Sequence, residues 1–216
     1  MNRLILASTS PRRAELLRQI GVAFEQRTIE VDESPRTGEV AAETALRLAV
    51  AKARAGRTLA GPGQAVLAAD TLVSVDGEAL GKPRDRDDFL AMLRRLSGRR
   101  HEVYTAVALA WEDASSAAPA RAWGMDAPRV REQDEPRAFL SVSHVDFRPL
   151  LDAEMAAYWE TGEPADKAGG YAIQGRAAVF ITRLEGSFSG VMGLPLFETA
   201  ELLRQAGIAT WNASHE

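Results

Sequence analysis

The sequence predicts an α/β protein in which helices flank a mixed, twisted β-sheet. Apolar runs typical of buried strands, such as residues 65–69, alternate with amphipathic stretches that repeat at helical spacing, such as residues 38–56. Asp76-Gly77, set between two apolar runs, is a strong signal for a two-residue hairpin and adds an antiparallel pair. The length of 216 residues allows one large domain or two small lobes, and we expect a single domain over residues 1–216.

The first element, residues 4–17, combines a strand, a hydroxyl-rich turn and the start of a helix. Ser10 is expected to cap this helix, whose first residue is a proline. Arg12 and Arg13 then lie in the first helical turn, where the helix dipole disfavours a cation by about 0.3 to 1 kcal/mol. An anion would resolve this conflict, because backbone N–H groups, the hydroxyls of Ser8 and Ser10 and two guanidinium groups suit a phosphate. The alternative is a solvated arginine pair on a surface helix.

A second strand is expected over residues 22–30, and Glu33 lies in the acidic loop that follows. Acidic loops are usually just solvated. The alanine-rich helix over residues 38–56 places Lys52 on or beside its apolar face. The Lys52 ammonium either extends along its stem to water or faces a cleft.

Residues 65–71 are a buried-type strand whose apolar run stops at Asp70. Because ligand sites of α/β sheets lie beyond the carboxyl ends of strands, we expect a catalytic acid or a metal ligand at Asp70. The alternative is a capping or turn aspartate. The hairpin over residues 72–80 would direct Lys82 back toward Asp70.

The middle of the chain is interpreted as structural. A helix capped by an aspartate covers residues 85–98, and strands are expected over residues 102–111 and 139–147. His101 is expected to be a polar residue at the edge rather than a general base. Residues 112–137 have little periodicity and are rich in Ala, Ser, Pro, Arg and acids, so we expect a mobile insertion there.

The loop over residues 163–175 is the second unusual stretch, between a helix at 152–162 and a strand at 178–184. Its glycines suit a backbone that bends tightly around a ligand, and the amide of Gln174 can pair with the edge of a base. The alternative is a glycine-rich surface loop.

The last helix, over residues 195–207, is expected to direct Phe197, Ala200 and Leu203 into the core. Residues 209–216 are expected to form a frayed tail.

Composition excludes several classes of protein and site. A net charge of -4 gives no basic field, so no nucleic-acid polymer is expected as a partner. The chain has no cysteine, and His101, His144 and His215 are scattered, so a metal would need oxygen ligands. No apolar run of membrane-spanning length and no signal sequence are present, so we expect a cytoplasmic protein that binds no membrane.

Lysine occurs only at Lys52, Lys82 and Lys167, whereas the other basic residues are arginine. These positions suit a compact ammonium that a planar guanidinium cannot replace. The alternative is that the three lysines occur there by chance. Cations beside the carboxylates of Glu33 and Asp70, without sulfur or histidine ligands, suit a polyphosphate bridged to Mg²⁺ or Mn²⁺.

Six short motifs occur in order along nearly the whole chain, at residues 6–13, 69–71, 81–83, 96–98, 166–175 and 191–195. Together they resemble the Maf (septum formation) family, whose members are nucleoside triphosphate pyrophosphatases. The sequence departs from the family pattern in the long polar segment near residues 112–136 and in Thr9, where glycine is also common.

The resemblance implies a mixed α/β fold, similar to inosine triphosphatase, with two lobes around a central cleft, and it is compatible with a homodimer. It implies hydrolysis of a nucleoside triphosphate between its α- and β-phosphates, with Mg²⁺ or Mn²⁺ as cofactor. Asp70 matches the proton acceptor, and with Glu33 it would hold the metal. Positions linked to substrate choice match Arg12, Thr71 and Gln174, and the rest of the cleft matches Ser8, Ser10, Arg13, Lys52 and Lys82.

The sequence of residues 167–175 is similar to that of the subgroup that acts on dTTP, UTP and their modified forms. Two alternatives stay open at this point. One is the same chemistry on 7-methyl-GTP or a non-standard purine triphosphate. The other is a regulator of division that senses nucleotides without cutting them.

Overall fold

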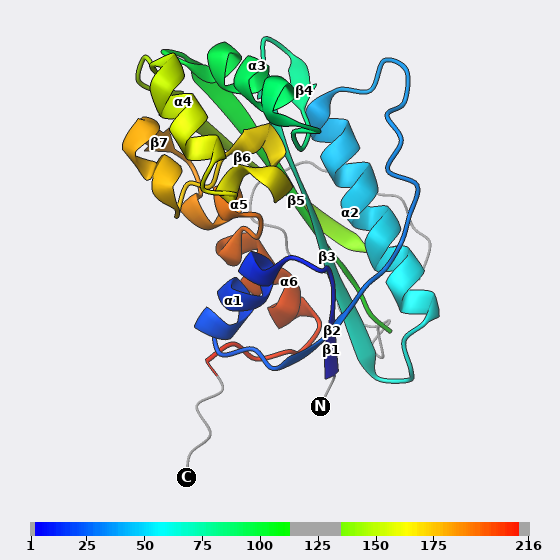
Figure 1. The fold of residues 1–216 in the computed structure, drawn as a ribbon. Helices are drawn as coiled ribbons and strands as arrows, with labels where there is room; N and C mark the ends of the chain where they lie inside the picture. Colours follow the sequence, from blue (N-terminus) through cyan, green and yellow to red (C-terminus); the bar gives the residue numbers. More distant parts are fainter. Residues whose placement is uncertain (1–2, 113–134, 212–216) are drawn as a thin grey trace.

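The computed structural model describes residues 3–112 and 135–211, and within them the strands form one seven-stranded mixed sheet (Figure 1). The order along the sheet is β2-β1-β3-β5-β6-β7, with β4 paired to β3. β1 is parallel to β2 and β3, and the other pairs are antiparallel. The strands are β1 (Arg3–Ala7), β2 (Phe24–Arg27), β3 (Gln64–Val75), β4 (Glu78–Leu80), β5 (Arg100–Ala110), β6 (Arg137–Phe147) and β7 (Ile181–Glu185).

Six α-helices of the described chain cover the sheet, with α2 on one face and α1 and α6 on the other (Figure 1). Helices α3 and α4 lie together at the far end of the long strands. None of the described helices is long and apolar enough to cross a membrane. The helices are α1 (Pro11–Gln19), α2 (Ala41–Thr58), α3 (Arg86–Leu96), α4 (Asp152–Trp159), α5 (Phe188–Met192) and α6 (Leu196–Gln205), with short 3-10 turns at Glu163–Asp166, Ala168–Gly170 and Arg176–Phe180.

The hydrophobic core divides the molecule into two lobes. In β1, Leu4 and Leu6 pack toward α1 and α6, whereas Ile5 and Ala7 pack toward the alanine face of α2, because side chains alternate along a strand. A separate cluster surrounds Phe89 at the other end of β3, β5 and β6. The predicted two-lobed α/β architecture is therefore confirmed, with the lobes sharing the long central strands.

The strand that contains Asp70 is longer than predicted. β3 does not stop at Asp70 but continues to Val75, because β5 pairs with it on both sides of the register pair Asp70↔Ala106. The strand that does end nearby is β1, whose last pair with β3 is Leu6↔Leu67. Beyond that pair β3 loses its parallel neighbour, and this gap in the sheet lets Asp70 face an open space.

The hairpin prediction is confirmed. Asp76 and Gly77 have φ angles of 56° and 78°, as a type I′ turn requires, and they join β3 to β4. Asp85 caps α3 by accepting a 2.8 Å hydrogen bond from the Asp88 N–H. Ser10 precedes α1 as predicted, but its side chain makes no capping hydrogen bond.

Two side chains differ from the prediction. Phe197 is 83% exposed, because the buried face of α6 consists of Thr199, Leu202 and Leu203, and Phe197 falls beside that stripe. His101 is not an edge residue but is buried, with its Nε2 2.8 Å from the hydroxyl of Tyr171. The aromatic rings around His101 exclude water, so the histidine belongs to the core.

Two predictions concern segments that are wholly or partly outside the described residues. Residues 113–134, most of the expected insertion, are among these, and so are residues 212–216 of the expected tail. The part of the tail that is described is attached, since the Trp211 N–H donates to the Ile20 carbonyl at 2.8 Å.

Burial of His101 makes the stability of the fold depend on pH. Desolvation lowers the pKa of His101 to about 4, below its ordinary value of 6.5. Between these values the unfolded chain binds a proton that the folded chain does not, so stability is complete above pH 6.5 and decreases as the pH falls toward 4.

We expect His101→Gln, whose side chain stays neutral, to remove this dependence of the unfolding free energy on pH. The loss that it prevents is on the order of 3 kcal/mol by pH 4. Urea unfolding of the wild type and the variant at several pH values between 7 and 4.5 measures it. Parallel stability profiles for the two proteins would contradict the assignment.

Candidate active site

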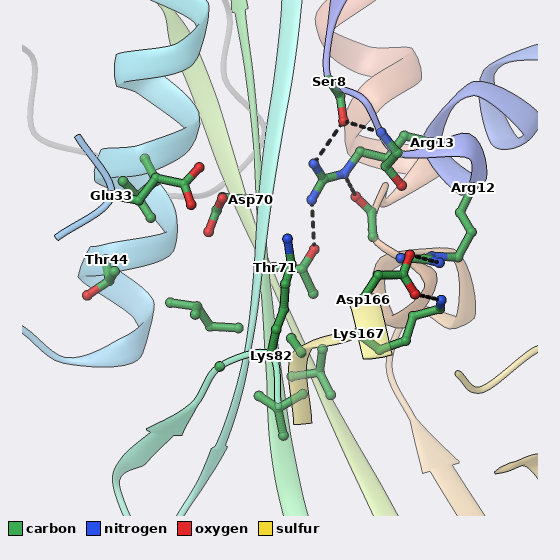
Figure 2. Close-up of a pocket in the computed structure, with 18 of the residues that line it drawn as sticks. Ser8, Arg12, Arg13, Glu33, Thr44, Asp70, Thr71, Lys82, Asp166 and Lys167 are labelled. Carbon is green, nitrogen blue, oxygen red and sulfur yellow. Dashed lines mark hydrogen bonds and ion pairs between the residues drawn. The ribbon is translucent and has the colours of Figure 1, made fainter. Parts of the chain in front are cut away.

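A cleft of about 700 Å³ lies where the two lobes meet (Figure 2). All ten residues that the sequence predicts for the site line it. They come from β3, the loop after β1, the start of α1, the loop before α2, α2 itself and the two loops that follow β4 and α4. These residues are Ser8, Ser10, Arg12, Arg13, Glu33, Lys52, Asp70, Thr71, Lys82 and Gln174. The sequence-based set therefore forms one contiguous surface.

Arg13 is held on three sides by uncharged oxygens. Its Nε donates to the Gly193 carbonyl at 2.8 Å, one terminal nitrogen donates to Ser8 Oγ at 3.2 Å, and the other donates to Thr71 Oγ1 at 3.3 Å (Figure 2). Burial lowers the pKa of Arg13, and the negative charge of Asp70 acts in the opposite direction. In the part of the chain that the structure describes, no carboxylate forms an ion pair with this guanidinium. The orientation of Arg13 is fixed while its charge stays available for an anion.

Asp70 and Glu33 share one cation on the other side of the cleft. The Lys52 ammonium lies 2.7 Å from Asp70 Oδ1 and 2.7 Å from Glu33 Oε1. The hydrogen bond from Lys52 lowers the pKa of Glu33, with further help from the charges of Lys82 and Arg13. The side chain of Asp70 is 12% exposed and that of Glu33 is 59% exposed, so water screens the Glu33 ion pair more strongly.

Lys82 reaches the cleft from the segment after the hairpin, and its backbone is tied to the glycine-rich loop. The Gly169 N–H donates to the Gly81 carbonyl at 2.9 Å. Gly169 and Gly170 have φ angles of 67° and 71°, and a Cβ at Gly170 would lie 2.9 Å from the Phe89 ring. Both glycines are therefore required for the loop to pack against the lobe beneath it.

A second charged group lies at the rim of the cleft opposite Glu33 and Asp70 (Figure 2). Asp166 Oδ2 is 3.5 Å from Arg12 Nη1, and Asp166 Oδ1 pairs with the Lys167 ammonium. Burial alone would raise the pKa of Asp166, but the Lys167 hydrogen bond and the two positive charges lower it. The sequence marked Lys167 by the rarity of lysine. Asp166 begins the motif at residues 166–175 but was not among the predicted site residues.

Thr105 is a further residue that the sequence did not reveal. Its buried hydroxyl donates to the Gly190 carbonyl at 2.8 Å and lies 3.1 Å from Thr71 Oγ1. It therefore supports Thr71, which in turn accepts from Arg13. A threonine in a strand gives no signal of this kind, because the contact is with α5, 85 residues away in the sequence.

The carboxylates suit a hard divalent ion that also binds a phosphate chain. Two carboxylate oxygens already converge on one cation, the Lys52 ammonium. Mg²⁺ is usually held through one or two carboxylates together with substrate phosphates and water. Across residues 3–112 and 135–211, no group of three or more His, Cys, Asp or Glu residues is placed to hold a metal. Glu33 and Asp70 thus fit such an ion when substrate oxygens complete its coordination.

The chain is similar to proteins of known family along nearly its whole length. A family model described as Maf-like protein matches residues 3–206. The dTTP/UTP pyrophosphatase of Methylococcus capsulatus is 50% identical over 208 residues, which cover 96% of this chain and 93% of the relative. The dTTP/UTP pyrophosphatase of Aromatoleum aromaticum is 47% identical over 220 residues, covering 95% and 96% of the two chains. Among solved structures, a HAM1 protein from Coxiella burnetii is 17% identical, with a TM-score of 0.44 over 95% of this chain and all of that one (100%).

The packing of the glycine-rich loop can be tested by two matched substitutions. Gly170 and Gly162 share a φ of 71°, but a Cβ at Gly162 would meet nothing within 4 Å. We expect Gly162→Ala to destabilise the fold by about 1 kcal/mol from backbone strain alone, and Gly170→Ala to cost about 1 to 3 kcal/mol more, because its Cβ contacts Phe89. Chemical denaturation measures both, and equal losses would show that Phe89 does not constrain the loop.

Proposed function

Since the chain belongs to the Maf-like protein family, we propose that it is a pyrophosphatase that hydrolyses dTTP, UTP and their modified forms to the monophosphate and pyrophosphate. The observation that carries this proposal is one cleft lined both by an oriented Arg13, which has no ion pair with a carboxylate of the described chain, and by the Asp70 carboxylate. The names of the relatives, which are about half identical over nearly the whole chain, support the same substrate class. We place the activity in the cytoplasm, where its nucleotide substrates are found.

Arg13, Ser8, Ser10 and Lys82 bind the phosphate chain in this proposal. Three of the five guanidinium N–H groups of Arg13 donate to protein oxygens, which leaves two to donate to phosphate oxygens. Because Arg13 is already oriented, binding loses little side-chain entropy. The ammonium of Lys82 is exposed in the same cleft and adds a second positive charge.

Asp70 accepts the proton of the attacking water. Its Oδ1 is fixed by Lys52, which leaves Oδ2 to orient water toward the α-phosphorus. The water oxygen forms a bond to the α-phosphorus as the bond to the α–β bridging oxygen breaks, and pyrophosphate leaves with that electron pair. Arg13 and Lys82 stabilise the negative charge that develops on the leaving group. Glu33 and Asp70 would hold Mg²⁺ or Mn²⁺, which supplies acidification of bound water and neutralisation of phosphate charge.

Thr71, Arg12 and Gln174 line the same cleft and are proposed to govern substrate choice. Thr71 lies next to Asp70 on β3 and accepts a hydrogen bond from Arg13. It therefore connects the proton acceptor, Asp70, to the phosphate-binding guanidinium. Arg12 and the exposed amide of Gln174 lie at the cleft surface, where they can donate to a base.

A panel of triphosphates tests the assignment: dTTP, UTP, CTP, GTP, ITP and 7-methyl-GTP, each with Mg²⁺ and with Mn²⁺. We expect dTTP and UTP to be the best substrates and to give equal amounts of monophosphate and pyrophosphate.

Asp70→Asn should lower kcat by about 1000-fold while nucleotide binding, measured by calorimetry, is retained. Asp152→Asn, outside the cleft, is the matched control. Undiminished turnover by Asp70→Asn would remove Asp70 from its role, and release of orthophosphate alone would exclude a pyrophosphatase.

A further inference from the structure

The charged group at the rim, formed by Arg12, Asp166 and Lys167, is unsuited to a phosphate. A carboxylate stands between the two cations, at 3.5 Å from Arg12 and in direct contact with the Lys167 ammonium. A phosphate brought to this point would meet the Asp166 carboxylate as well as the two cations, whereas no carboxylate of the described chain forms an ion pair with the Arg13 guanidinium. The rim group therefore suits an uncharged part of the substrate that both donates and accepts hydrogen bonds.

The order of hydrogen-bonding groups at the rim is donor, acceptor, donor. Arg12 and Lys167 can only donate, and the ionised Asp166 can only accept. The side chain of Asp166 is 61% exposed, and its carboxylate has lone pairs that its two partners do not use. Uracil and thymine present the complementary order along one edge: the O2 carbonyl, the N3–H and the O4 carbonyl. Cytosine presents an unprotonated N3 and an amino group instead, which would place an acceptor against a carboxylate.

The rim group is held in place before any base arrives. The Lys167 N–H donates to the Pro164 carbonyl at 3.0 Å, and the Lys167 carbonyl accepts from the Gly170 N–H at 3.0 Å. The side chains of Arg12 and Lys167 are only 21% and 13% exposed, so little rotamer freedom is left to lose. Arg12 comes from α1 and Lys167 from the glycine-rich loop, so the contact also joins two separate walls of the cleft.

We propose that Asp166 and Lys167, with Arg12, determine base specificity: Asp166 accepts the N3–H of uracil or thymine, and the two cations donate to the flanking carbonyl oxygens. This inference rests on the proposed pyrophosphatase function and assigns recognition of the base to residues on the side of the cleft opposite Glu33 and Asp70. Discrimination against cytosine then comes from repulsion between its N3 and the Asp166 carboxylate, as well as from the lost hydrogen bond.

The test compares UTP with CTP in the wild type and in Asp166→Asn. The asparagine amide can donate to the cytosine N3, so we expect the ratio of kcat/KM for UTP to that for CTP to fall by about 10-fold or more. Any general effect of the lost charge on phosphate binding acts on both nucleotides and cancels in the ratio. Asp152→Asn is the matched control, because Asp152 forms a comparable exposed pair with Arg94 at 3.2 Å outside the cleft. Its ratio should equal that of the wild type.

A base analogue gives a readout that does not depend on the variant folding. UTP methylated at N3 lacks the donor, and we expect the wild type to use it at least about 10-fold less well than UTP methylated at C5. Equal use of the two analogues, or a uniform change for UTP and CTP in Asp166→Asn, would overturn the proposal and leave Asp166 as a counter-ion for its neighbours. Failure of the wild type to cut any triphosphate would instead overturn the proposed function itself.

Discussion

The site depends on one constraint: Arg13 is held by the fold without a carboxylate of the described chain to neutralise it. Its three contacts come from the loop after β1, from β3 and from the turn after α5, which are far apart in the sequence. Desolvating a guanidinium costs free energy, and neutral acceptors recover only part of it. The buried positive charge of Arg13 therefore favours binding of an anionic ligand in the cleft.

The sheet topology explains why the cleft is where it is. β1 ends at Ala7 while β3 continues past Asp70, so β3 has no parallel neighbour where Asp70 and Thr71 line the cleft. Helix α2 lies along β3 and places Lys52 against Asp70, so the ammonium orients the carboxylate. The hairpin then turns the chain back and brings Lys82 to the same opening. Asp70 and Lys82 thus come from points where the sheet loses a neighbour or an element ends, whereas Lys52 comes from within α2.

Local sequence signals predicted most of the elements and a set of residues that line one cleft, because turns, caps and charge placement depend on short-range chemistry. Turn residues, a cap aspartate and helical periodicity identified the hairpin and α3, and the unusual placement of Arg12, Arg13 and the lysines identified the cleft. The errors have a common cause in tertiary context. Pairing with β5 extends β3 beyond Asp70. Aromatic rings bury His101. Phe197 is exposed because α6 turns a different face toward the core. The contacts of Thr105 with Gly190 and of Asp166 with Arg12 cross the fold, and no local pattern contains them.

The position of water attack tests the central claim most directly. In the arrangement described, Asp70 activates water against the α-phosphorus while Arg13 and Lys82 bind the leaving pyrophosphate. Single-turnover hydrolysis of UTP in water labelled with oxygen-18, followed by mass spectrometry of both products, locates the new bond. The account predicts that the label appears in UMP. Label in the pyrophosphate would mean attack on the β-phosphorus and would contradict the assignment of the cleft.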